Sequence, residues 1–245
     1  MRYEITDSHR KMTAKQRQAL TEFFREVKGI PTDEDALQQV YFCDWYEHDF
    51  AVSWFEVIAW DGPKAVGYIR VLRDPKDVRQ WLSCDVHVRR DYRRRRIATR
   101  MYRKVIETLY SFEAAETLVA AVNKNNVKSI NLHEKLGFRN TKRLCKFADF
   151  YVVEDDTKFV KPLYHYLPVR KNFEGAVERV LPIWTEWKEA NGTYRGEEAE
   201  KETIRGLLKD VEDGRCRFDG LWRGNRMVGF RTQVGETIVT YNREE

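Results

Sequence analysis

The sequence carries few marks of a secreted, membrane-spanning or metal-binding protein. Its four cysteines lie far apart and form no C-x-x-C pair; they are Cys43, Cys84, Cys145 and Cys216. This spacing predicts neither a disulfide framework nor a metal site, and it favours a reducing compartment. No apolar run approaches the roughly 20 residues of a membrane helix, and the opening MRYEITDSHRKMTAKQ lacks the apolar core of a secretory signal. We therefore expect a soluble, cytoplasmic protein without a metal or a membrane partner.

Aromatic and charged residues are both plentiful. The 245 residues include 7 Trp, 12 Tyr and 13 Phe, and 42% of the chain is hydrophobic, which is enough for a packed core although 34% is charged. This length suits one large domain, or one domain with a smaller unit. The net charge of +5 is small beside 44 basic and 39 acidic residues. Local clusters of charge are therefore more informative than the total.

Hydrophobic periodicity predicts alternating strands and helices in an α/β fold. Turn residues separate the segments: Asp61-Gly62 joins two strands, and Gly137 ends a helix. The predicted order is strand, two helices, three strands, helix, strand, helix and two strands, which gives a mixed central sheet flanked by helices. The central strand–helix–strand unit places two strands parallel. The segments are 1–6, 13–29, 31–42, 53–74 (two strands), 80–88, 97–112, 117–123, 126–138, 144–153 and 159–167.

Residues 168–245 repeat part of this pattern. The stretch W-D-G-P-K-A-V-G-Y, residues 60–68, aligns without gaps to W-R-G-N-R-M-V-G-F, residues 222–230. Upstream, ERVLPIWTEWKEANG resembles RQALTEFFREVKG of the first helix. We interpret residues 1–167 as a complete domain and residues 168–245 as a truncated second copy that stops before any arginine cluster. The alternative is two unrelated hairpins that share a common W-x-G turn.

Seven arginines lie between Arg89 and Arg100. A solvated charged face, a nucleic-acid patch and a phosphate-binding loop are three interpretations of such a cluster. The cluster follows a strand that ends at Val88 and precedes an amphipathic helix that begins near Ile97. A helix N-terminus presents unpaired N–H groups to an anion, and arginines beside it add charge-assisted hydrogen bonds. This context favours a phosphate-binding loop.

Two sequence patterns accompany the cluster. After the strand that ends at Val88, residues 93–98 read R-R-R-R-I-A, which fits Q/R-x-x-G-x-G/A at its first and last positions. Residues 126–138, NVKSINLHEKLGF, fit N-x-x-(A/S)-x-x-L-Y-x-x-x-G-F at each defined position except His133. In this order, and with this strand and helix pattern, the two blocks resemble the GNAT superfamily of acetyl-CoA-dependent N-acetyltransferases.

The resemblance extends over about residues 1–167 and implies acetyl-CoA as cosubstrate, without a metal. The loop and the first helical turn would bind the pyrophosphate of acetyl-CoA through backbone N–H groups, while arginine side chains meet its other phosphate. The strand before the loop would pair with the pantetheine arm and polarise the thioester carbonyl. The second motif would line the thiol end. The implied cofactor-binding residues are Val86, Val88, Arg93, Arg94, Arg95, Arg96, Ile97, Ala98, Thr99, Asn126 and Ser129.

The sequence departs from the family pattern at two positions. Arg96 stands where the family has its middle glycine, which lets the backbone approach a phosphate without a Cβ atom. If Arg96 closes the loop, the protein is a pseudoenzyme that keeps the fold as an interaction module. His133 stands where the family usually has a tyrosine that protonates the leaving thiolate. A histidine transfers protons near neutral pH, so His133 is the candidate general acid; the alternative is a partly buried histidine on the helix.

The implied reaction is attack of a neutral amine on a thioester, which needs a base for the amine proton and an acid for the thiolate. Asp85 and His87 alternate along their strand with Cys84 and two valines, so we expect the two polar side chains on one face, beside the cofactor cleft. Either is a candidate catalytic base, and Glu56 on a preceding strand is a weaker one. The alternatives are an ion pair with a neighbouring arginine for Asp85 and a satisfied strand-end histidine for His87.

The segment 31–50, PTDEDALQQVYFCDWYEHDF, contains six acidic side chains and no Lys or Arg. Tyr41, Trp45 and Tyr46 lie among them. By resemblance this segment lines the acceptor side, where an acidic and aromatic wall attracts a cationic amine such as a polyamine, an aminoglycoside, a lysine side chain or a peptide N-terminus. The alternative is an ordinary acidic surface. We expect an amine acceptor as the partner and a monomer or homodimer; nucleic acid binding to the arginines is the less favoured alternative.

Overall fold

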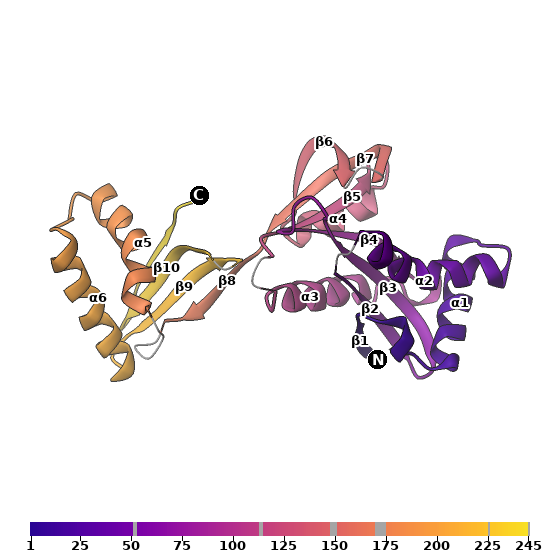
Figure 1. Ribbon diagram of the computed structural model, residues 1–245, viewed down its shortest axis with the longest axis horizontal. Coiled ribbons are helices and arrows are strands. Elements are labelled where there is room, and N and C mark those ends of the chain that lie inside the picture. Colours follow the sequence, from indigo (N-terminus) through magenta and orange to yellow (C-terminus); the bar gives the residue numbers. More distant parts are fainter. Residues whose placement is uncertain (51–52, 113–114, 148–150, 170–174, 225, 245) are drawn as a thin grey trace. The chain divides into compact units, whose positions relative to one another are not determined.

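The computed structural model describes residues 1–50, 53–112, 115–147, 151–169, 175–224 and 226–244, and the chain forms two compact units (Figure 1). The first comprises Met1–Leu163 and the second Tyr164–Glu245. This division lies slightly before the expected one after residue 167, because strand β8 (Tyr164–Pro168) pairs with a strand of the second sheet. Each unit has its own sheet and its own core.

The first unit has the predicted order of elements. Its helices are α1 (Ala14–Lys28), α2 (Asp33–Phe50), α3 (Ile97–Leu109) and α4 (Val127–Lys135), with short 3-10 turns η1 (His9–Lys11) and η2 (Arg90–Tyr92). Its strands are β1 (Arg2–Thr6), β2 (Trp54–Asp61), β3 (Lys64–Arg73), β4 (Gln80–Val88), β5 (Thr117–Asn123), β6 (Arg139–Phe147) and β7 (Tyr151–Pro162). They form one sheet in the order β1-β2-β3-β4-β5-β7-β6, in which β4 and β5 are parallel and the other neighbours antiparallel. The predicted α/β fold with a mixed central sheet is confirmed.

Helix α1 begins and ends where its sequence dictates. Thr13 and Gln16 form a capping box before its first turn. Gly29 ends the helix with φ 67°, a left-handed conformation that glycine adopts at little cost. Phe24 lies on its buried face, against the sheet. These limits make Lys28 the last helical residue.

Helix α2 is longer than predicted. Its first turn is capped by Thr32, whose Oγ1 accepts a hydrogen bond from the backbone N–H of Asp35 at 3.1 Å. The helix then continues to Phe50, past the predicted end at residue 42. Cys43 and Tyr46 are fully buried, so the added length keeps its apolar contact with the sheet.

Helices cover both faces of the first sheet (Figure 1). Helices α1 and α2 pack on one face, against Trp60 and Tyr68 among others. Helix α3 packs on the other face, where a Cβ atom on Gly67 of β3 would lie 2.9 Å from Ile97 Cγ2. This close approach requires glycine in β3. Since Gly67 pairs with Val88, the N-terminus of α3 lies beside the end of β4.

Strands β4 and β5 are neighbours over only part of their length. Their register runs from Gln80 opposite Thr117 to Ser83 opposite Ala120. Beyond this point β4 continues to Val88 and pairs with β3, while β5 pairs with β7. Among the described strands, none lies on the β5 side of the last part of β4. Its backbone groups on that side are therefore available to a ligand.

A bulge at Asp85 interrupts the alternation of side chains along β4. Asp85 has φ 52°, and the register with β3 shifts between Cys84 and His87. The predicted grouping of Cys84 with the two valines is therefore wrong: Cys84 packs against the cluster beneath α2, whereas the valines pack against the core on the α3 side. The bulge gives Cys84 and His87 the same side of the strand.

The last two predicted strands of the first unit are divided differently in the structure. Strand β7 ends at Pro162, which has no backbone N–H, and Leu163 donates instead to the carbonyl oxygen of Glu116 at 3.0 Å. The predicted strand 159–167 is thus split between β7 and β8. Residues 148–150, part of the predicted strand 144–153, lie outside the described residues.

The second unit consists of β8, α5 (Ala176–Ala190), α6 (Glu197–Glu212), β9 (Arg217–Arg223), β10 (Arg226–Val234) and β11 (Thr237–Asn242). Its antiparallel strands lie in the order β11-β10-β9-β8, and both helices pack on one face (Figure 1). Trp222 faces Met227 as Trp60 faces Ala65, and both hairpins shift register at the following valine. These likenesses agree with a truncated copy, which stays a prediction. None of the described helices is long and apolar enough to cross a membrane.

Candidate active site

The arginine cluster turns between the end of β4 and the start of α3. Arg94 and Arg96 both have left-handed backbone conformations, with φ 63° and 58°. Such conformations cost a non-glycine residue about 1–2 kcal/mol. Arg96 is also the N-cap of α3, and its side chain forms no capping hydrogen bond. The first turn of α3 therefore presents the N–H groups of Ile97, Ala98 and Thr99 without an intrahelical partner.

The arginine side chains divide into buried and exposed ones. Arg89 is buried: its Nε donates to the carbonyl oxygen of Ala65 at 2.7 Å, and its guanidinium pairs with Glu26 of α1. It does not join the exposed cluster. Among the described residues, none of the six exposed arginines of the cluster has an ion-pair partner, and four of them make no side-chain hydrogen bond or ring contact: Arg90, Arg94, Arg96 and Arg100. Together with the open N-terminus of α3, they form a positively charged surface.

Arg93 and Arg95 are exposed and make local contacts. Nε of Arg93 donates to the carbonyl oxygen of Val88 at 3.1 Å. The guanidinium of Arg95 lies 5.0 Å from the ring centroid of Tyr92, in cation–π contact. Neither contact neutralises the charge, so both side chains add to the positive potential of the loop.

Asp85 lies between two cations. Its Oδ2 is 2.7 Å from Nη1 of Arg70, and its Oδ1 is 2.9 Å from Nζ of Lys28. Burial acts to raise the pKa of Asp85, but the contact with His87 and the charges of Arg70 and Lys28 outweigh it and lower the pKa well below its ordinary value. The carboxylate is therefore ionised and paired at neutral pH. Such a group is a weak proton acceptor.

His87 follows Asp85 beyond the bulge and is partly exposed. Its Nε2 lies 3.8 Å from Oδ1 of Asp85, the oxygen that Lys28 also contacts. This separation is longer than a hydrogen bond. The structure thus brings the two candidate bases together at the point where β4 has left β5.

Arg70 connects Asp85 to a buried polar network beneath α2. Its Nε lies 3.3 Å from Oε1 of Glu56 on β2, and its Nη2 donates to the backbone carbonyl of Gln39 on α2 at 2.6 Å. Its guanidinium lies 4.6 Å from the ring centroid of Phe42. Arg70 is 1% exposed, so it joins β2, β4 and α2 from inside the protein.

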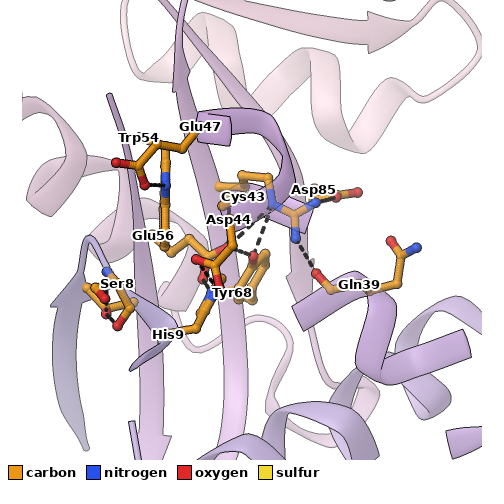
Figure 2. Close-up of polar contacts among 12 residues, drawn as sticks. Ser8, His9, Gln39, Cys43, Asp44, Glu47, Trp54, Glu56, Tyr68 and Asp85 are labelled. Atoms are coloured by element: carbon orange, nitrogen blue, oxygen red, sulfur yellow. Dashed lines mark hydrogen bonds and ion pairs between the residues drawn. The ribbon is translucent and has the colours of Figure 1, made fainter. Parts of the chain in front are cut away.

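Figure 2 shows the network around Glu56, which is completely buried. Oε2 of Glu56 lies 2.9 Å from Nε2 of His9, and Oε1 accepts hydrogen bonds from Tyr68 and Cys43. Nδ1 of His9 lies 3.2 Å from Oδ1 of Asp44 on α2. Burial acts to raise the pKa of Glu56, but the bond to His9 and the charge of Arg70 lower it. Glu56, the weaker candidate base, is therefore enclosed within the protein. It helps to hold Arg70, which in turn contacts Asp85.

His133 lies on α4 and is 3% exposed. Its Nδ1 lies 2.7 Å from the carbonyl oxygen of Ser129, and its Nε2 lies 2.6 Å from the hydroxyl of Tyr102. A neutral ring satisfies both contacts by donating from Nδ1 and accepting at Nε2. Burial lowers the pKa of His133, although the bond to Ser129 opposes it. Tyr102 is a site contact that the sequence pattern does not reveal, because its spacing fits an ordinary core position of α3.

Asn126 and Ser129 hold the start of α4. Oδ1 of Asn126 accepts a hydrogen bond from the N–H of Ser129 at 3.1 Å, as an N-cap does. Oγ of Ser129 lies 3.4 Å from Nδ1 of His133. Tyr102 in turn lies 3.2 Å from Oγ of Ser83, where β4 and β5 separate. The predicted contact of Asn126 and Ser129 with the cofactor stays a prediction.

The predicted residues form three groups around the end of β4. The arginine loop lies at its end, the pair Asp85 and His87 lies on the strand, and His133 of α4 contacts Tyr102 of α3. The valines between them, Val86 and Val88, are partly buried against the core. Within the described residues, no three His, Cys, Asp or Glu side chains are grouped as metal ligands.

Most of the acidic segment 31–50 forms α2, and its aromatic residues do not form a single wall. Tyr41 and Trp45 are 39% and 47% exposed, whereas Tyr46 is buried. Asp44 lies near buried His9, and on the inner side of the helix the Gln39 carbonyl oxygen accepts a hydrogen bond from Arg70. The exposed side of α2 therefore presents acidic and aromatic groups to solvent.

Known proteins resemble this chain in sequence and in fold. The family model described as Acetyltransferase (GNAT) family matches residues 15–138. No curated protein sequence matches the chain. A GNAT-family acetyltransferase structure from Desulfovibrio desulfuricans has a TM-score of 0.50 and 13% identity, over 66% of this chain and 99% of that chain. An aminoglycoside 6'-acetyltransferase type Ii has a TM-score of 0.50 and 18% identity, over 65% of this chain and 97% of that chain. At these identities the structural matches show a shared fold.

Proposed function

Because the chain belongs to the GNAT acetyltransferase family, we propose that it transfers the acetyl group of acetyl-CoA to the primary amine of a cationic acceptor. One observation carries the proposal. The exposed arginine loop lies at the open N-terminus of α3, directly after the part of β4 that has separated from β5. Phosphate-binding groups therefore stand at one end of an unpaired strand edge.

The phosphates of acetyl-CoA bind at the loop in this proposal. The first turn of α3 carries the positive end of the helix dipole, and Arg94 and Arg96 add two guanidinium groups with no ion-pair partner among the described residues. Arg96 has the left-handed backbone conformation that glycine adopts most readily. The loop therefore has the conformation expected for a glycine at this position, although the residue is arginine. The residues present therefore fit a phosphate.

The acetyl carbonyl lies against the end of β4. The pantetheine arm continues the sheet there by bonding to backbone groups of residues 86–88 on the side that β5 has left. An N–H group of this segment donates to the carbonyl oxygen and stabilises the negative charge that develops during attack.

His87 is the proposed general base, and Asp85 stabilises the imidazolium that forms. Asp85 is the weaker candidate because Lys28 and its buried arginine partner keep its pKa low. The ammonium form of the acceptor gives one proton to His87, directly or through water, and His87 releases it to solvent. The neutral nitrogen then attacks the carbonyl carbon and the C–N bond forms. The nitrogen passes its second proton to His87, and the C–S bond breaks as the thiolate leaves.

His133 is the proposed acid for the thiolate. In the structure both ring nitrogens are engaged, with Ser129 and Tyr102. Protonation of the sulfur requires a proton on Nε2 and exchange of the Tyr102 bond for one to the thiolate. This step predicts that removal of the Tyr102 hydroxyl changes the turnover number more than the Michaelis constant.

The acceptor is proposed to be cationic because of α2. Residues 31–50 carry six acidic side chains and no Lys or Arg, so they attract a positively charged amine. Exposed Tyr41 and Trp45 add aromatic faces to this surface.

Calorimetric titration of acetyl-CoA into nucleic-acid-free protein tests the proposal. We expect one-to-one binding that weakens by about tenfold or more in Arg94→Ala/Arg96→Ala, since hydrogen bonds to charged groups contribute about 1.5–3 kcal/mol each. Arg103→Ala is the matched control, because it removes an exposed arginine from the middle of α3. A screen of primary amines that follows thiol release then tests transfer.

Each result has a clear consequence. Binding with thiol release supports the transferase, and binding without release for any amine supports a pseudoenzyme. No binding of acetyl-CoA overturns the proposal. Salt-sensitive binding of RNA or DNA that acetyl-CoA does not displace would then assign the arginines to nucleic acid.

A further inference from the structure

Lys28, the last residue of α1, occupies the position of a bound ammonium ion. Its Nζ lies 2.9 Å from Oδ1 of Asp85 and donates to Oε1 of Gln39 at 2.9 Å. The ring centroid of Phe24 lies 5.4 Å from the same nitrogen. A carboxylate, an amide oxygen and an aromatic ring are groups that recognise a primary ammonium.

The carboxylate has a second cation beside it, in addition to Lys28. Its second oxygen, Oδ2, lies 2.7 Å from Arg70, which is itself held by Glu56 and the Gln39 carbonyl. When Lys28 leaves, Asp85 therefore stays ionised and keeps Oδ1 in place. Another cation can therefore replace Lys28 beside Asp85 without leaving the carboxylate unpaired. In an ion pair with only two members, loss of one charge leaves the other uncompensated.

The site adjoins the proposed base. Nε2 of His87 lies 3.8 Å from Oδ1 of Asp85. An ammonium bound to this oxygen is next to the group that takes its proton, and both lie on the strand whose backbone holds the thioester in the proposed function.

We propose that Asp85, Gln39 and Phe24 form the ammonium subsite for the acceptor, and that Lys28 fills it until a substrate ammonium displaces it. This inference rests on the proposed function. The side chain of Lys28 is 20% exposed and ends a helix, so its stem can move into solvent while the helix stays in place. Two oxygen atoms at hydrogen-bond distance select an ammonium that carries N–H donors and reject a quaternary one.

Removal of Lys28 leaves the subsite open. If Lys28 fills the subsite in about 90–99% of molecules, its removal lowers the Michaelis constant of a small primary amine by about tenfold to a hundredfold. The turnover number changes less, because Lys28 takes no part in the chemical step.

Thermal unfolding of Lys28→Ala with propylammonium chloride tests binding without any transfer reaction. We expect propylammonium to raise Tm of Lys28→Ala in a saturable way, because a ligand that binds only the folded state stabilises it. Sodium chloride and tetramethylammonium chloride at the same ionic strength should not. Lys15→Ala, which removes an exposed lysine from the same helix, should respond like the wild type.

Lys28→Met is the second variant, because it keeps the side-chain volume and loses the charge; it serves if Lys28→Ala does not fold. We expect propylammonium to stabilise it less than Lys28→Ala and more than the wild type, since the methionine side chain partly fills the opening. Equal Tm shifts in the Lys28 variants, in Lys15→Ala and in the wild type would show that Lys28 is a structural ion pair and overturn the inference.

The transfer reaction separates failure of this inference from failure of the proposed function. If the wild type releases thiol with primary amines while Lys28→Ala shows no lower Michaelis constant and no propylammonium effect, the transferase stands and the subsite falls. If Lys28→Ala binds propylammonium while no variant binds acetyl-CoA, the subsite stands and the transferase falls.

Discussion

Nη1 of Arg70 lies 2.7 Å from Oδ2 of Asp85, so a buried guanidinium holds the left-handed residue at the bulge of β4. A buried charge is costly unless opposite charges and hydrogen bonds surround it. Arg70 has Glu56 on β2, Asp85 on β4 and the Gln39 carbonyl on α2 as partners. The bulge, helix α2 and the buried network therefore form one electrostatic unit.

Substitution of Arg70 should break this unit. Arg70→Met leaves the carboxylate of Glu56 buried without its cation, and we expect a loss of about 3–5 kcal/mol in the free energy of unfolding. Urea denaturation of the purified variant measures it. Arg103→Met, on the exposed side of α3, should change stability by less than about 0.5 kcal/mol. A loss from Arg70→Met as small as that of the control would mean that the network contributes little.

The lowered pKa of Asp85 predicts a pH dependence of stability. Because the folded pKa lies below the unfolded one, Asp85 contributes stability that is present above about pH 4 and lost as the pH falls through the folded pKa. Asp85→Asn should be less stable than the wild type at pH 7. At pH 3 the difference should be smaller by about 1 kcal/mol, since one pH unit below the unfolded pKa corresponds to about 1.4 kcal/mol.

Chemical denaturation at the two pH values checks this. Asp91→Asn is the control, because Asp91 is exposed and has no ion-pair partner among the described residues. The free energy of unfolding of Asp91→Asn should differ little from that of the wild type at both pH values. A difference for Asp85→Asn that does not change with pH would contradict the ion pairing of Asp85.

The sequence patterns predicted the order of elements and the family, and the family-model match confirms the resemblance. Periodicity and caps act locally, so Thr13, Gly29 and the central strands could be located from their neighbours in the chain. The predicted end of α2 at residue 42 is too early, because Cys43 and Tyr46 extend the buried face of the helix through contacts with strands distant in the sequence.

The charged partners of the site were harder to predict. Asp85 meets Lys28 and Arg70 only after α1 and β3 are packed beside β4, and its bulge depends on register with β3. In the sequence, Tyr102 has the spacing of an ordinary core residue of α3. Its contact with His133 arises only when α4 packs beside α3. A local pattern shows which side chains share a face, but tertiary packing decides which of them pair.

His133 predicts a second, separate pH dependence. The unfolded chain binds a proton at this residue below about pH 6.5, while burial lowers the pKa in the folded state. Its contribution to stability is therefore complete above about pH 6.5 and decreases as the pH falls toward the folded pKa. His133→Phe should be less stable by about 1–3 kcal/mol at pH 7.5, because the Ser129 carbonyl and the Tyr102 hydroxyl lose their partner.

Between pH 7.5 and 5.5, His133→Phe should lose about 1 kcal/mol less stability than the wild type. Denaturation curves at both values measure this, with His48→Gln as a control for an exposed histidine. If both variants follow the wild type over this interval, His133 is not held neutral in the fold.

The left-handed backbone at Arg96 predicts a stabilising substitution. Relief of the strain is worth about 1–2 kcal/mol, and the added freedom of glycine in the unfolded chain costs about 0.4–1 kcal/mol. Arg96→Gly should therefore stabilise the protein by about 0.5–1 kcal/mol, which is the difference between these two effects. Arg103→Gly should instead destabilise it by about 1 kcal/mol, because residue 103 lies inside α3 in ordinary helical conformation. Thermal and urea unfolding of the two variants test the opposite signs. If both substitutions destabilise the protein, the backbone at residue 96 does not have the left-handed conformation that favours glycine.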